Sequence, residues 1–174
     1  MIRIPRLNLC VALDPKPVGA ARQSTRAYER CMMRSSMTAT RQHIQSLERY
    51  AAQSGARLIR GELPDSVHGQ VAEGLITLSA RLSPEQELLA LVHELTHWLA
   101  HRPGCEHAAA SSRTVYEYEA EAVEALVMAR LGVRLADAVP GEDAAPTDDL
   151  LSSSVTRVVS TSRRICQALG LETD

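Results

Sequence analysis

Two histidines and a glutamate stand close together in the chain, in an order that can support metal chemistry. His93, Glu94 and His97 form an H-E-x-x-H motif. In a helix, positions i and i+4 lie about 40° apart on one face and one turn apart along the axis, so two imidazoles at this spacing can converge on one cation. Zinc suits neutral imidazole ligands. The motif therefore predicts a zinc site that His93 and His97 share.

Glu94 is predicted to act on water rather than to bind the metal. It lies to one side of the histidine stripe, where its carboxylate can reach the water that a catalytic zinc keeps in its fourth position. The metal lowers the pKa of this water, Glu94 accepts the proton, and the resulting hydroxide attacks a polarised carbonyl. Glu94 is thus the expected general base of a hydrolase. The alternative is that His93 and His97 are core or surface histidines with ordinary hydrogen-bond partners.

A third ligand must come from another part of the chain. The metzincin continuation, H-E-x-x-H-x-x-G-x-x-H, is absent because Ala100 and Pro103 occupy its Gly and His positions. His101 lies a further turn along the helix, too far from a metal centred between His93 and His97. We expect it to be a surface histidine or a neighbour of the ligands rather than a ligand.

A later predicted helix offers carboxylates instead. Glu117, Glu121 and Glu124 recur at helical spacing and give one acidic face, whereas Glu119 points nearly the opposite way. Glu117 could bind the metal, and Glu121, one turn on, could accept a hydrogen bond from a ligating imidazole. Two alternatives stay open: the acidic stripe is a solvated face, or Glu117 only completes a capping box with Thr114.

The two blocks of residues together resemble a known family. H-E-L-T-H at 93–97 and E-Y-E-A-E at 117–121 resemble the ImmA/IrrE family of zinc metallopeptidases and the related ArdC-type antirestriction proteins. The resemblance extends from the segment near residue 57 to about Gly132. It implies a gluzincin arrangement, in which Glu117 matches the metal-binding glutamate and Glu121 the residue that hydrogen-bonds a ligand. It also implies cleavage of a peptide bond in a regulatory protein such as a transcriptional repressor.

The helix that carries the motif has clear start and stop signals. Ser83 stands at the N-cap position, Pro84 at the first helical position, and Gln86 completes a capping box. The helix is expected to run until Pro103 and Gly104 end it. Its apolar residues cover most of its circumference, which is typical of a central, buried helix.

The remaining elements are predicted from periodicity and from turn residues. Short segments rich in branched residues indicate three strands, at 57–63, 67–72 and 75–80. A hairpin through Glu73 and Gly74 joins the last two, and strand 75–80 could hold an extended peptide as an edge strand. Further helices are expected at 24–34, 38–54, 115–131 and 148–169.

These elements predict an α+β fold. We expect one zincin-like domain at residues 23–171, in which a small antiparallel three-stranded sheet packs against the central helix and the further helices cover it. Residues 1–22 hold three of the eight prolines and are expected to form an irregular arm.

Composition narrows the function classes and the partners. Of the 174 residues, 45% are hydrophobic and 23% charged, as in a globular domain, and a net charge of −2 gives no footprint for nucleic acid or an anionic membrane. The sequence has no apolar run of membrane length, no secretory leader and no paired cysteines, which together favour the cytoplasm. The family resemblance implies a protein or peptide substrate. The alternatives are an ArdC-like antirestriction or nucleic-acid-associated protein and a non-catalytic zinc module.

Overall fold

The computed structural model describes residues 24–102, 113–133 and 148–171. The predicted N-terminal arm, residues 1–22, lies outside them. The described residues form an α+β fold in the order α1 (Ser24–Gln53), β1 (Arg57–Gly61), β2 (Gly69–Ala72), β3 (Leu75–Ser79), α2 (Pro84–Thr96), the π-helical turn η1 (His97–His101), α3 (Arg113–Arg130) and α4 (Asp148–Ala168).

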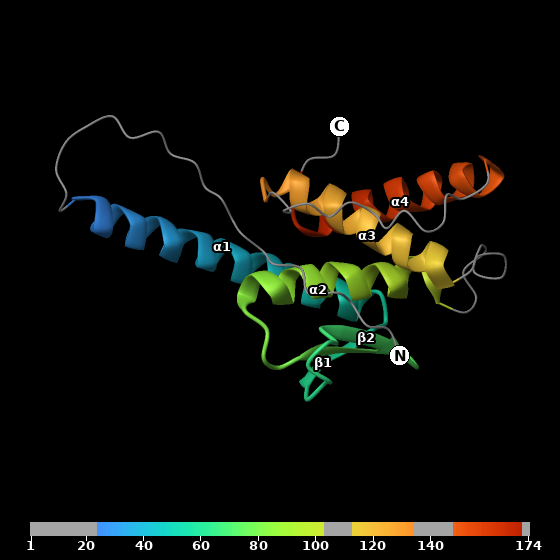
Figure 1. Ribbon diagram of the computed structural model, residues 1–174, viewed down its shortest axis with the longest axis horizontal. Helices are drawn as coiled ribbons and strands as arrows, with labels where there is room; N and C mark the ends of the chain where they lie inside the picture. Colours follow the sequence, from blue (N-terminus) through green and yellow to red (C-terminus); the bar gives the residue numbers. More distant parts are fainter. Residues whose placement is uncertain (1–23, 103–112, 134–147, 172–174) are drawn as a thin grey trace.

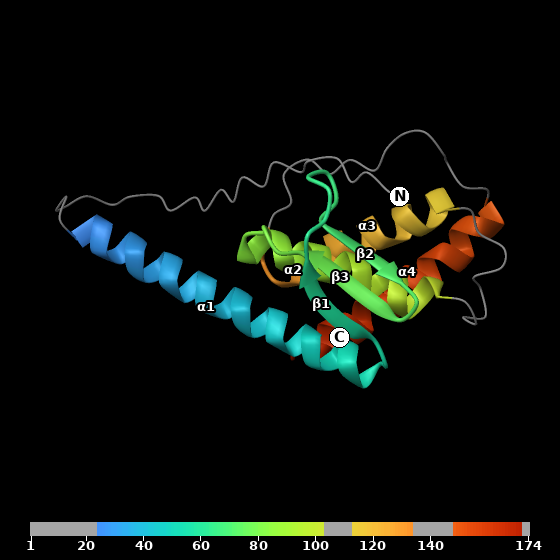
Figure 2. The same ribbon diagram turned by 90° about the horizontal axis from the view of Figure 1, so that it is seen from below.

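Helix α2 lies in the middle of a layered arrangement (Figure 1). The sheet covers one side of α2, and α3 and α4 cover the other. Helix α1 runs alongside α2 and β1 (Figure 2). The apolar core joins all these elements through side chains that include Leu47, Ile76, Leu91, Leu95, Val123 and Ile165. Helix α2, which contains His93 and Glu94, is thus buried along most of its length between the sheet and the other helices.

The sheet is mixed, so the prediction of an antiparallel sheet is wrong. Its order is β1-β3-β2, with β1 parallel to β3 and β2 antiparallel to β3. The hairpin is confirmed, with positive φ at both turn residues, Glu73 (50°) and Gly74 (81°), as a tight hairpin turn requires. Strand β3 is the central strand, not an edge, because it is the most apolar of the three and its residues from Ile76 to Ser79 are buried.

The helices follow their predicted signals, with two differences. The capping box at Ser83 and Gln86 is present, and Gly55 follows α1 with a φ of 88°. The two helices expected at 24–34 and 38–54 are one helix, because residues 35–37 contain neither Gly nor Pro to break it. The motif helix changes to a π-helical turn at His97. Among the described helices, none has the length and apolar character needed to cross a membrane.

Candidate metal site

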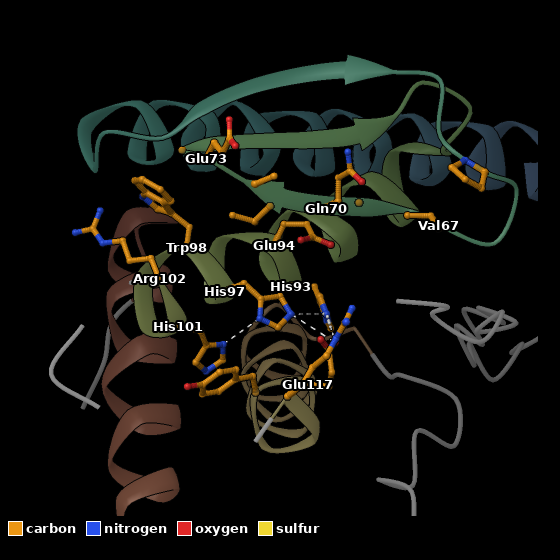
Figure 3. A pocket seen from close by; sticks show the side chains of 17 residues that line it. Val67, Gln70, Glu73, His93, Glu94, His97, Trp98, His101, Arg102 and Glu117 are labelled. Atoms are coloured by element: carbon orange, nitrogen blue, oxygen red, sulfur yellow. Dashed lines mark hydrogen bonds and ion pairs between the residues drawn. The ribbon is translucent and has the colours of Figure 1, made fainter. Parts of the chain in front are cut away.

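The motif residues lie at the junction of α2 and η1. Helix α2 packs against α1, α3 and the sheet. Leu91, Val92 and Leu95 are fully buried around them and fix the rotation of the helix. This rotation turns His93 and His97 toward α3 and places Glu94 toward β2 (Figure 3). His93 is 5% exposed and Glu94 4% exposed, so both polar groups need compensating partners.

Three ligand atoms come together at this point. His93 Nε2 lies 3.1 Å from His97 Nε2 and 3.3 Å from Glu117 Oε2, and His97 Nε2 lies 3.5 Å from the same Glu117 oxygen. A tetrahedral ion with bonds of about 2.0 to 2.1 Å has neighbouring ligand atoms about 3.3 to 3.4 Å apart. The three atoms therefore match one face of such a tetrahedron, and His93, His97 and Glu117 form a group that could hold a metal ion.

Glu117 reaches the histidines from near the start of α3. Burial alone would raise the pKa of Glu117, but the neighbouring imidazoles of His93 and His97 outweigh it and lower this pKa to about 2. Burial would likewise lower the pKa of His93, but the nearby carboxylates of Glu117, Glu124 and Glu94 raise it to about 10. For His97 burial prevails and the pKa is lowered. Without a metal, a charged His93 can therefore donate from Nε2 to the lone pair of a neutral His97 across the 3.1 Å between their Nε2 atoms.

Glu94 occupies a tight space between β2 and the two histidines (Figure 3). A Cβ atom at Gly69 would lie 2.6 Å from Glu94 Cγ and 2.8 Å from its Oε1, so only glycine fits at Gly69 beside the carboxylate as it stands. Burial raises the pKa of Glu94 to about 7, against the opposing charge of His93. A carboxylate with a pKa near neutrality suits a group that both accepts and returns a proton.

The acidic face of α3 is rotated slightly from the expected position. Glu124, not Glu121, approaches the second ring nitrogen of His93, with its Oε2 3.5 Å from Nδ1. Ala120 and Glu124 are buried against α2, whereas Glu121 lies on the exposed flank of the same face. The difference follows from helix geometry, because positions seven apart lie about 20° from each other and positions four apart about 40°.

Glu119 is the residue whose importance the sequence did not reveal, whereas His101 takes the second of the two positions expected for it, next to a ligand. Glu119 does point away from the ligand group, but into the interior, where it is 1% exposed and contacts His101, Ser154 and Arg157. Burial alone would raise the pKa of Glu119, but hydrogen bonds to these residues lower it to about 2. The only signal in the sequence was the position of His101, one turn beyond His97.

The ligand group opens into a cleft of about 580 Å³, within the size range of small-ligand and peptide sites. Strand β2 forms one wall, and its outer edge faces the motif helix (Figure 3). Trp98 and Arg102 line one end of the cleft, with the Arg102 guanidinium 4.7 Å from the centre of the indole ring. Pro64 and Val67 also line it. The cleft thus gives a ligand access to both the metal group and a strand edge.

No family model, no curated protein and no solved structure matches this chain.

Proposed function

We propose that the protein is a zinc-dependent hydrolase that cleaves a peptide bond. The observation that carries the proposal is the triangle of His93 Nε2, His97 Nε2 and Glu117 Oε2, with the buried carboxylate of Glu94 beside it. Two imidazoles and one carboxylate are a ligand set that zinc hydrolases use. The resemblance to ImmA/IrrE metallopeptidases assigns the same residues to the same roles.

Each side chain of this site would have a different role in hydrolysis. When bound, zinc would lower the pKa of a coordinated water and polarise the substrate carbonyl. Glu94 would accept a proton from water in the cleft and return it to the leaving amine, for which its pKa of about 7 is suitable. Glu124 would hold the His93 ring through Nδ1, which leaves Nε2 directed at the ligand group.

An extended peptide is the substrate that fits the cleft best. Strand β2 pairs with β3 on one side only, so its other edge carries backbone N–H and C=O groups that can pair with a further strand. This role was expected for the segment 75–80, which is instead the central strand. A peptide added along β2 would pass beside Glu94 and the histidine pair. A protein substrate, such as a cytoplasmic regulator, agrees with the resemblance.

A purely structural zinc module is less compatible with the site. Structural zinc ions are held by four protein ligands, whereas the group found among the described residues contributes three. A structural site would also gain nothing from burying Glu94, whose carboxylate costs desolvation energy there. Three ligands with a carboxylate at their side are the arrangement of a catalytic site.

Metal removal tests the proposal directly. The purified protein should contain about one zinc per chain and should cleave members of a library of extended, fluorescence-quenched peptides. Treatment with 1,10-phenanthroline should abolish cleavage, and added zinc should restore it, because Glu94 has no activated water to act on without the metal. The non-chelating isomer 1,7-phenanthroline is the matched control. Cleavage that persists in zinc-free protein would contradict the proposal.

Substitution of Gly69 by alanine should impair the reaction without unfolding the chain. The new Cβ would displace the flexible end of Glu94 rather than backbone, so we expect a folded protein that binds zinc. A displacement of about 1 Å of a catalytic group can cost on the order of 100-fold in rate. The control is Gly61→Ala in β1, where the nearest atom, Thr77 Cγ2, is at an ordinary 3.5 Å. Equal kcat in both variants would show that the fit against Glu94 is unimportant.

A further inference from the structure

A line of buried side chains leads from His97 away from the cleft. His97 Nδ1 lies 3.0 Å from His101 Nδ1, and His101 Nε2 lies 2.8 Å from Glu119 Oε2. The side chain of His101 is 4% exposed and that of Glu119 is 1% exposed. The ring of Tyr116 stacks on His101 with centroids 4.5 Å apart, which fixes the plane of the imidazole. The hydrolytic reaction proposed above does not use this line of residues.

Helix α4 anchors the far end of the line. Arg157 Nε lies 2.9 Å from Glu119 Oε2, and its terminal nitrogen lies 2.5 Å from Oε1. Ser154 Oγ also donates to Glu119 Oε1, at 2.5 Å. A carboxylate paired in this way is ionised and can only accept hydrogen bonds. Arg157 therefore supplies the positive charge that compensates the buried carboxylate, and Ser154 adds a hydroxyl donor.

These contacts fix which ring nitrogens carry protons. Glu119 can only accept, so His101 must donate to it from Nε2. In a neutral imidazole the other nitrogen then holds a lone pair, so His101 Nδ1 accepts a proton that His97 donates from Nδ1. His97 Nε2 is left with its lone pair directed toward His93 and Glu117. This lone pair is the one that a metal ligand needs.

We propose that Glu119 and His101 are positioning residues, which hold His97 in the tautomer and orientation that metal binding requires. The inference rests on the proposed zinc site and adds the reason for the long polar connection to α4. It also gives both ligating histidines the same kind of support, since the Nδ1 atom of each is connected to a glutamate of α3. His93 Nδ1 faces a glutamate of α3 directly, Glu124, whereas His97 Nδ1 reaches a second one, Glu119, through an intervening imidazole.

Glu119→Gln should reverse the direction of these hydrogen bonds. Arg157 and Ser154 together direct more donors at Oε1 of Glu119 than at Oε2, so the amide oxygen of the new side chain should take the Oε1 position and the amide nitrogen should face His101. His101 Nε2 must then accept and its Nδ1 must donate. His97 would accept at Nδ1 and carry its proton on Nε2, where it blocks the metal. The expected result is a proton that moves from Nδ1 to Nε2 of His97.

Long-range proton–nitrogen NMR spectra of the full-length, zinc-free chain can assign the ring protons of His97. Wild type should show Nδ1–H and Glu119→Gln should show Nε2–H, with zinc bound about 10- to 100-fold more weakly, as for other residues that orient metal ligands. The matched control is Glu62→Gln, an exposed site on the surface. If His97 keeps its Nδ1 proton in Glu119→Gln, or if that folded variant binds zinc as wild type does, the proposal is wrong.

Two variants of His101 keep the proposal testable if Glu119→Gln does not fold, because they leave the Glu119–Arg157 pair in place. The amide introduced by His101→Gln can accept from His97 and donate to Glu119, so this variant should bind zinc within a few-fold of wild type. His101→Leu can do neither and should bind about 10- to 100-fold more weakly. Equal zinc affinity in the two variants would overturn the proposal. Wild type without zinc affinity would instead contradict the proposed function, whereas the ring-proton assignment tests this inference alone.

Discussion

Replacing Glu94 with glutamine should abolish peptide cleavage while the zinc stays bound. The amide is close to the carboxylate in size, so it fits beside Gly69 and leaves His93 and His97 in place, but it cannot accept a proton from water. General acid and base catalysis contributes roughly 100- to 10,000-fold, and we expect a loss in kcat of that order. The measurements are kcat on the best peptide of the library and zinc content by elemental analysis.

The comparison with other variants makes this result specific. Gly69→Ala displaces the same carboxylate without removing it, so its kcat should fall less than that of Glu94→Gln. Glu62→Gln, an exposed substitution of the same kind, should leave kcat unchanged. Full cleavage by Glu94→Gln with zinc in place would remove Glu94 from the reaction. The ligand group of His93, His97 and Glu117 would be unaffected by that outcome.

The sequence predicted those parts of the site that depend on one helix. The relation of His93, Glu94 and His97 is set by the helical repeat, and the helix itself is specified by Ser83 and Gln86. The approach of Glu117 depends on how α3 packs against α2, and the motif spacing alone left a capping role open for it. The family resemblance indicated the metal-binding role, and the structure brings Glu117 to the histidines.

The parts that the sequence did not predict depend on contacts between elements far apart in the chain. Glu119 is two residues from Glu117 and lies on another side of α3, so its role depends on Arg157, which α4 supplies. The mixed sheet has a similar cause. Hairpin geometry fixes how β2 and β3 pair. No signal in the nearby sequence specifies that β1 pairs with β3 rather than with β2, or that this pairing is parallel.

Loss of a ligating side chain should remove the metal altogether. His93→Ala leaves two of the three ligand atoms, so zinc affinity should fall further than the roughly 10- to 100-fold that follows removal of an outer hydrogen-bond partner. Glu117→Gln should also bind zinc more weakly than Glu121→Gln, because Glu121 lies on the exposed flank of α3. Competition with a chromophoric chelator measures these constants. If Glu121→Gln proves the weaker binder, the ligand assignment on α3 is wrong.

Zinc binding to the wild-type chain should also release a proton from His93. Without a metal, nearby carboxylates raise the pKa of His93 to about 10, so its imidazole is charged at neutral pH, whereas zinc needs the neutral ring. A ligand whose pKa is raised loses its proton more easily as the pH rises, so apparent zinc affinity should increase by about tenfold per pH unit near neutrality. Calorimetry in buffers of different ionisation enthalpy measures the released proton. His93 would have to be neutral in the metal-free chain if zinc affinity proved independent of pH between 6 and 8, roughly the range in which unperturbed histidines titrate.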